Sequence, residues 1–180
     1  MGRSGGPPGS FAERRRDGLL PNFYPQDRDE PDYGAIDAPM WFVLAVEWFG
    51  RARREPGKPP PLLDAVREII DAYRKGTSFG IGAGPDLLLS GGAAGRALTW
   101  MDAVVDGSPV TPRHGRPVEI NALWHAALKA SARLERLAGD HARARDLEAA
   151  WEKLWRQTCA AGAAQSLAES QRETDVRRVA

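Results

Sequence analysis

The chain has 180 residues, 42% of them hydrophobic, which is enough for one domain with a substantial core. Its 25 basic and 24 acidic residues leave a net charge of +1, which argues against a protein that binds nucleic acid or an anionic membrane. The longest apolar stretch, residues 38–46, is far shorter than the ~20 residues of a membrane-spanning helix. A single cysteine, Cys159, and a Gly/Pro-rich start unlike a secretion signal favour a cytoplasmic protein.

The first half of the chain predicts two helices. Residues 1–10 hold four Gly and two Pro and are expected to be disordered. Asp37 stands at an N-cap position, Pro39 follows in the first turn, and apolar residues at helical spacing then predict a helix over 38–53. A second helix is expected over 62–75, where Gly76 ends it.

The second half predicts a small β element and two more helices. Short apolar segments at 79–81 and 87–89, separated by a Gly-Pro turn, indicate a hairpin. Helical periodicity returns over 118–137 and over 140–157. The predicted fold class is therefore all-α with a minor β-hairpin insertion.

Two runs, residues 98–103 and 111–124, hold the side chains that a sugar site needs. Together they contain two carboxylates, two tryptophans, two arginines and one asparagine. Charged and amide groups bind sugar hydroxyls, flat aromatic rings cover the C–H faces of a pyranose, and hydrolysis of a glycosidic bond needs an acid and a base. The runs therefore predict a carbohydrate site.

Asp102 is the predicted general acid of that site. It follows Trp100 and Met101, whose apolar side chains are expected to desolvate the carboxyl and raise its pKa. The alternative is a carboxylate that only caps a turn in the loop.

The predicted substrate contacts each have a structural alternative as well. Asp37 and Trp41 share a helix face at i,i+4, where they would serve as hydroxyl ligand and stacking platform, or as helix cap and core tryptophan. Glu119 would bind a hydroxyl pair or interact with the helix dipole. Arg113 and His114 would orient the sugar, hold the carboxylates in place, or belong to an ordinary surface loop.

No metal ion or cofactor is expected. The histidines, His114, His125 and His141, are scattered without metal-ligand spacing, and there is no second cysteine. The Gly-rich stretch 80–95 lacks the lysine of a phosphate-binding loop.

Several motifs closely resemble the C-terminal domain of glycogen debranching enzymes, over about residues 11–129. They are residues 18–22, Tyr33, Asp37, Trp41, and the runs 73–77, 98–103 and 111–124. The resemblance implies an (α/α)6 barrel of the six-hairpin glycosidase type, related to those of glucoamylase and trehalase. It also implies inverting hydrolysis of the α-1,6-linked glucose at branch points of glycogen or its limit dextrin, with Asp102 as the general acid. The substrate-binding residues are then expected to be Asp37, Trp41, Trp100, Arg113, His114, Glu119, Asn121 and Trp124.

The chain also departs from that family in extent. Twelve helices with their connections need at least roughly 215 residues, and the family region expected to supply the catalytic base is not found. We therefore expect a partial domain over 11–138, a divergent helical or irregular tail over 139–180, and self-association or a companion chain that completes the barrel. The alternative is a non-catalytic remnant that binds α-glucan through Trp41, Trp100 and Trp124, or that only packs as a helical domain.

Overall fold

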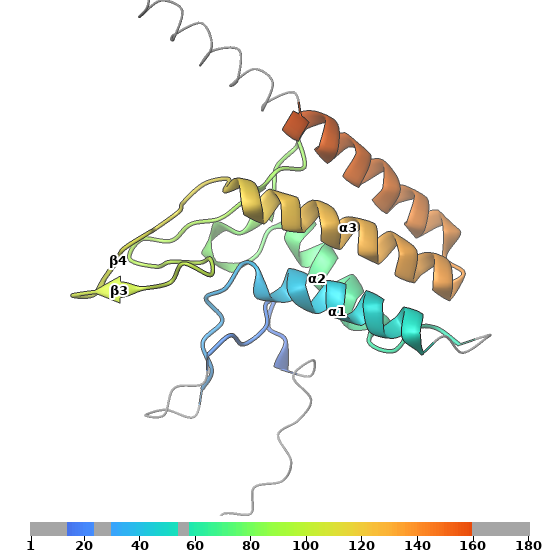
Figure 1. Cartoon of the computed structure of the whole chain (residues 1–180), viewed down its shortest axis with the longest axis horizontal. Coiled ribbons are helices and arrows are strands. Elements are labelled where there is room, and N and C mark those ends of the chain that lie inside the picture. The colour runs from blue at the N-terminus through green and yellow to red at the C-terminus, as the bar shows by residue number, and fades with distance from the viewer. Residues whose placement is uncertain (1–13, 24–29, 54–57, 160–180) are drawn as a thin grey trace, which may run out of the picture.

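The computed structural model describes residues 14–23, 30–53 and 58–159. The predicted disorder of residues 1–10 lies outside the described residues, as do residues 160–180 of the expected tail. Helices dominate the described chain (Figure 1): α1 (Ala38–Ala52), α2 (Leu63–Lys75), α3 (Val118–Ala138) and a helix over 141–159, called the C-terminal helix below. Their bounds differ by at most two residues from those predicted, and the mostly α-helical class is confirmed.

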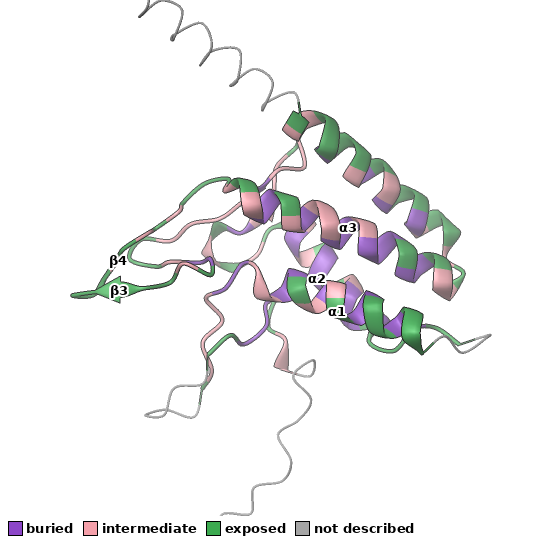
Figure 2. Cartoon of the chain, viewed as in Figure 1, coloured by how far each residue is buried: buried purple, intermediate pink, exposed green. Residues whose placement is uncertain are grey.

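Three of the helices form a layer, and the fourth lies behind it. α1, α3 and the C-terminal helix lie side by side across the front of the view, and α2 lies behind them (Figure 1). The buried residues gather where α2 meets that layer (Figure 2), because each helix turns an apolar stripe toward the others. The largest fully buried helical side chains are Met40, Ile69, Ile70, Tyr73, Ile120, Trp124 and Leu128.

The predicted hairpin is present and slightly displaced. β1 (Gly82–Ala83) pairs antiparallel with β2 (Leu89–Ser90). The expected strand at 79–81 starts later because a 3-10 turn, Ser78–Gly80, occupies its place, with Phe79 at a φ of 61°.

A second hairpin was not predicted. β3 (Val104–Val105) pairs antiparallel with β4 (Ser108–Pro109) and projects away from the helices (Figure 1). The turn residues Asp106 and Gly107 have φ values of 49° and 74°. An Asp-Gly pair is favoured where both turn residues need a positive φ, so this dipeptide was the available signal.

A buried carboxylate joins three helices. Glu135 of α3 is 1% exposed and accepts hydrogen bonds from Arg67 of α2 at 2.9 and 2.7 Å. Its Oε1 also lies 3.1 Å from Nε of Arg143 in the C-terminal helix. The charge is thus paired on two sides, which is the condition under which a carboxylate can remain in a core.

None of the helices in the described part of the chain has the length and apolar character needed to cross a bilayer.

Candidate functional site

A cavity of about 390 Å³ lies between α1 and α3, beside the loop that leads to β3. We call it the Trp41 cavity. Residues one helical turn apart form its walls: the N-cap residue 37 and residues 41 and 44 of α1, and residues 119, 122, 123 and 126 of α3. The full lining is Asp37, Trp41, Leu44, Trp100, Glu119, Ile120, Ala122, Leu123 and Ala126.

Two tryptophans of the cavity have open ring surface. Trp41 is 59% exposed and Trp100 is 66% exposed. An exposed indole beside a cavity offers a flat apolar face for the C–H face of a sugar ring. Both residues were predicted as substrate contacts, and the structure brings them together.

Asp37 occupies the N-cap position of α1, yet its side chain makes no capping hydrogen bond. The carboxyl is half-buried on the cavity wall. Burial raises its pKa, backbone N–H groups of Asp37 and Ala38 oppose the shift, and the negative charge of Asp102 adds to it. Asp37 therefore holds its proton to a higher pH than an ordinary aspartic acid.

The phenol of Tyr73 lies behind Asp37, fully buried. It donates a hydrogen bond of 2.9 Å to the carbonyl of Ile36, and its pKa is raised well above the usual value by burial and by the charge of Asp37. The hydroxyl therefore stays protonated and fixes the backbone one residue before Asp37.

Asp102 does not line the Trp41 cavity, and the expected desolvation by its neighbours is absent. Asp102 is exposed and so is Trp100, because the chain leaves the core after the buried Leu98 and Thr99 and turns outward into the β3–β4 hairpin. Its charge nevertheless acts on Asp37. The acid role of Asp102 therefore stays a prediction.

Arg113 connects Glu119 to the loop of Asp102. Its guanidinium pairs with the Glu119 carboxylate, and its Nη1 lies 3.2 Å from Sδ of Met101. The structure thus brings Arg113 and Glu119 together, which fits the alternative in which Arg113 holds a carboxylate in place. Met101, adjacent to Asp102, is a contact that the sequence did not indicate.

Asn121 and Trp124 lie in the core and not on the cavity wall. Asn121 is 4% exposed, accepts a 2.7 Å hydrogen bond from the N–H of Leu89, and donates to the carbonyls of Leu89 and Pro117 at 3.0 and 3.1 Å. Trp124 is 1% exposed and donates from its indole N–H to the carbonyl of Leu87 at 3.2 Å. Both side chains hold the β1–β2 hairpin on α3, which corrects the expectation that they touch substrate.

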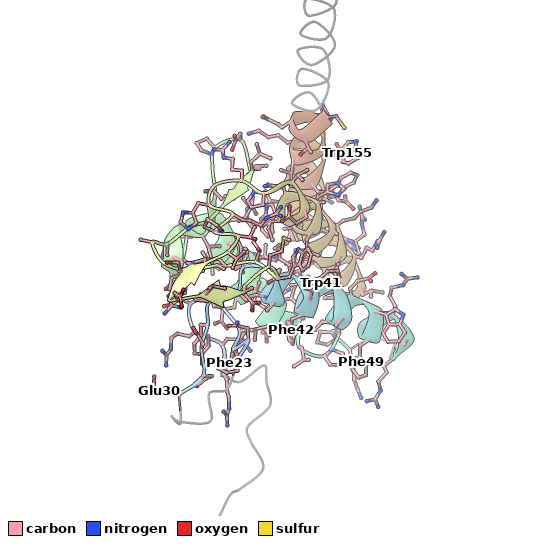
Figure 3. All side chains as sticks on the ribbon, turned by 60° about the vertical axis from the view of Figure 1, so that its left-hand side comes forward. Phe23, Glu30, Trp41, Phe42, Phe49 and Trp155 are labelled. Carbon is pink, nitrogen blue, oxygen red and sulfur yellow. The ribbon has the colours of Figure 1, made fainter. Side chains whose placement is uncertain are left out.

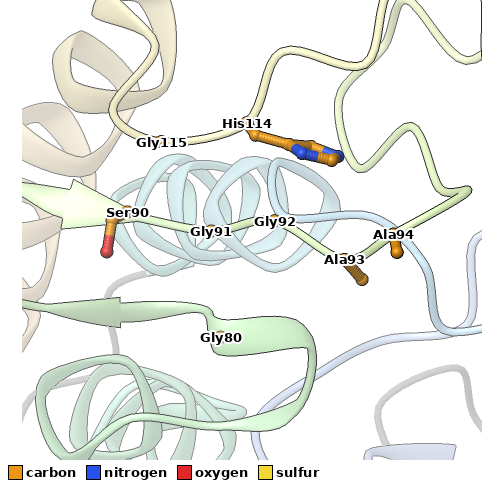
Figure 4. A pocket seen from close by; sticks show the side chains of 8 residues that line it. All are labelled: Gly80, Ser90, Gly91, Gly92, Ala93, Ala94, His114 and Gly115. Carbon is orange, nitrogen blue, oxygen red and sulfur yellow. The ribbon is translucent and has the colours of Figure 1, made fainter.

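His114 is placed in a different cavity, also of about 390 Å³, which Figure 4 shows from close by. Its ring lies over Gly92, where a Cβ would be 3.2 Å from the imidazole carbon Cγ. Its Nε2 lies 3.4 Å from the carbonyl oxygen of Arg96. His114 is therefore not brought together with Asp37 and Trp41. The other residues lining its cavity are Gly80, Ser90, Gly91, Ala93, Ala94 and Gly115.

The apolar α3 residues of the Trp41 cavity were not predicted as site residues, although helical spacing could have found them. Ala122, Leu123 and Ala126 follow Glu119 at intervals of three, four and seven, and so share its side of the helix. Within the three described ranges, no group of three or more His, Cys, Asp or Glu side chains could hold a metal ion.

Comparison with known proteins gives one result. The family model described as amylo-alpha-1,6-glucosidase matches residues 9–175, which is longer than the 11–129 over which the sequence motifs show the resemblance. No curated protein and no solved structure matches the chain.

Proposed function

The chain belongs to the amylo-alpha-1,6-glucosidase family, and from that premise we propose that it acts in hydrolysis of α-1,6-linked glucose at branch points of glycogen. The observation that carries the proposal is the meeting of two indoles and two carboxyls, from Trp41, Trp100, Asp37 and Glu119, on one cavity. Indole faces stack on a pyranose and carboxylates accept its hydroxyl hydrogens, so this wall suits a terminal glucose unit. Glycogen and its limit dextrin are the proposed ligands.

Each polar group of the wall has a role in the proposal. Glu119, held by Arg113, is the charged acceptor for a pair of hydroxyls. Asp37 is a second acceptor, or a donor when it carries its proton, which its raised pKa favours. Trp41 and Trp100 cover the two faces of the ring.

Asp102 is proposed as the general acid, on the resemblance of its motif. An inverting mechanism places the acid and the base roughly 6.5–9.5 Å apart, with a water between the base and the anomeric carbon. Asp102 protonates the leaving glycosidic oxygen, and the base removes a proton from the attacking water. We propose that the described helices form part of an (α/α)6 barrel and that a companion part of that barrel supplies the base.

Cleavage of a phosphorylase limit dextrin in the presence of azide tests the proposal without the companion's base, and Asp102→Asn is measured beside the unchanged chain. Azide added to the assay takes the place of the activated water: it attacks the anomeric carbon as the C–O bond breaks and the proton of Asp102 passes to the leaving oxygen. We expect glucosyl azide from the unchanged chain and none from Asp102→Asn. Equal product from both would remove Asp102 from the acid role.

A second candidate function is binding of α-glucan without hydrolysis, and the open faces of the two indoles favour it. Quenching of tryptophan fluorescence by limit dextrin separates the two. Quenching that Trp41→Ala abolishes, with no product under any condition, supports binding alone. Absence of both quenching and product removes both functions and leaves a helical packing domain.

A further inference from the structure

The outward face of α1 is apolar and largely exposed, and the guanidinium of Arg53 lies 5.5 Å from the ring centroid of Phe49. Trp41, Trp48 and Phe49 are 59%, 74% and 39% exposed, and Ala45 and Ala52 are also exposed. Figure 3 labels Trp41 and Phe49 along this helix. Because an exposed apolar patch of this kind marks an interaction surface, the face is expected to be covered.

α1 is also apolar on its inward side. Its charged residues are Glu47 and Arg51, and Glu47 is buried, 3.6 Å from Arg133 of α3. A helix that is apolar all round is normally buried on all sides. One side of α1 already packs on α2 and α3, so the opposite side lacks its cover.

The order of residues on the outward face is complementary to itself. Trp41, Ala45, Trp48 and Ala52 follow one another in steps of four, three and four, the spacing of a coiled-coil seam. In an antiparallel pair of α1 helices about a two-fold axis, Trp41 faces Ala52 of the second copy and Trp48 faces Ala45. Large residues then meet small ones at every layer, the arrangement that packs well, whereas a parallel pair would set Trp against Trp.

The charges at the two ends of α1 favour the same orientation. Asp37 stands at the N-terminal end, and Arg51 and Arg53 at the C-terminal end. Antiparallel pairing brings the acidic end of one helix near the basic end of the other and opposes the two helix dipoles. Parallel pairing would bring like charges together.

We propose that the chain forms a two-fold symmetric homodimer in which the α1 helices pack antiparallel through Trp41, Ala45, Trp48 and Ala52. Such an interface is isologous, so the same apolar face is covered in both copies. The pairing stands on α1 alone and does not depend on the proposed hydrolysis.

Sedimentation equilibrium of the full chain tests the dimer. Ala45→Glu places a carboxylate against the indole of Trp48 and is expected to raise the dimer dissociation constant roughly 10-fold or more. Ala149→Glu makes the same change at an exposed position of the C-terminal helix and should leave that constant unchanged. Circular dichroism checks that both variants keep their helices. A monomer at every concentration, or a dimer that Ala45→Glu does not weaken, overturns the proposal.

Disulfide cross-linking tests the orientation. In a Cys159→Ser background, copies carrying Trp41→Cys are mixed with copies of different length carrying Ala52→Cys and then oxidised. Antiparallel packing joins the two species to each other, because position 41 faces position 52. Products that join each species only to itself indicate parallel packing and overturn the proposed orientation.

Discussion

Asp102 lies close enough to Asp37 for its charge to act on that residue. The pKa of Asp37 is raised first by burial of its carboxyl and further by the negative charge of Asp102. One carboxyl stands at the start of α1 and the other in the loop before β3, so the pair links two segments far apart in the sequence. Protonation at the cavity wall is therefore set jointly by the helix and the loop.

Asp37→Asn is expected to stabilise the protein at neutral pH. A carboxyl whose pKa is higher in the folded state binds protons more tightly there than in the unfolded chain, so the free energy of unfolding falls as pH rises between the unfolded and the folded pKa. Asparagine carries no charge, so Asp37→Asn removes this pH-dependent loss of stability. The variant should therefore be no more stable than the unchanged chain below the unfolded pKa, and its gain in stability should be complete above the folded pKa. Urea unfolding over a series of pH values measures it.

Asp106→Asn, the same change at an exposed turn, is the control for this pH series. A uniform loss of stability in Asp37→Asn at every pH would contradict the prediction. It would show that the hydrogen bonds from the backbone N–H groups to the Asp37 carboxylate stabilise the fold by more than burial of the charge destabilises it.

Asn121→Ala is expected to lower the free energy of unfolding by about 2–3 kcal/mol, because two buried hydrogen bonds to Leu89 and a part-buried one to Pro117 are lost. The N–H and the carbonyl of Leu89 are then left without the partner that Asn121 supplies. Urea unfolding monitored by circular dichroism measures the change. Asn22→Ala, at an exposed asparagine, is the matched variant and should change stability little. Equal losses in the two variants would count against the structural role of Asn121.

Glu135→Gln is expected to destabilise the chain by about 2–4 kcal/mol, because it keeps the shape of the side chain and removes the charge that Arg67 and Arg143 both face. Thermal unfolding at low and high salt gives the measurement, and salt should reduce the difference only slightly since Glu135 is buried.

Glu148→Gln supplies the comparison for Glu135. It removes the charge that pairs with Arg136, at 2.7 Å between α3 and the C-terminal helix, in a more exposed setting. Its effect should be smaller and more sensitive to salt. A larger loss of stability in Glu148→Gln than in Glu135→Gln would show that the buried network does not hold the three helices together.

The helices could be predicted because their signals are local. Asp37, Pro39 and Gly76 mark helix ends, and apolar residues at helical spacing fill the lengths between them. Asn121 and Trp124 were assigned to substrate because both residue types also bind sugars. The side of α3 that they share with Leu128 pointed to the core instead, since these three positions are three and four residues apart.

The exposure of Asp102 could not be predicted from its neighbours in the chain. Two bulky apolar residues before a carboxyl shield it only if the loop folds back on them, and whether it does depends on where the β3–β4 hairpin leads the chain. The Asp106-Gly107 turn was a readable signal for that hairpin. The contact of Arg113 with Met101 spans the hairpin and appears only once its strands are paired.

The indole of Trp41 belongs to two surfaces of the protein. Its ring forms part of the wall of the cavity between α1 and α3, and the same ring is the first large residue on the outward face of α1. In the proposed dimer the second copy packs against the same side chain on which the proposed sugar stacks, so we expect the two occupancies to compete. By thermodynamic linkage, each then weakens the other by the same factor. We therefore expect α-glucan binding at this cavity to fall as the protein concentration rises and the proposed dimer forms.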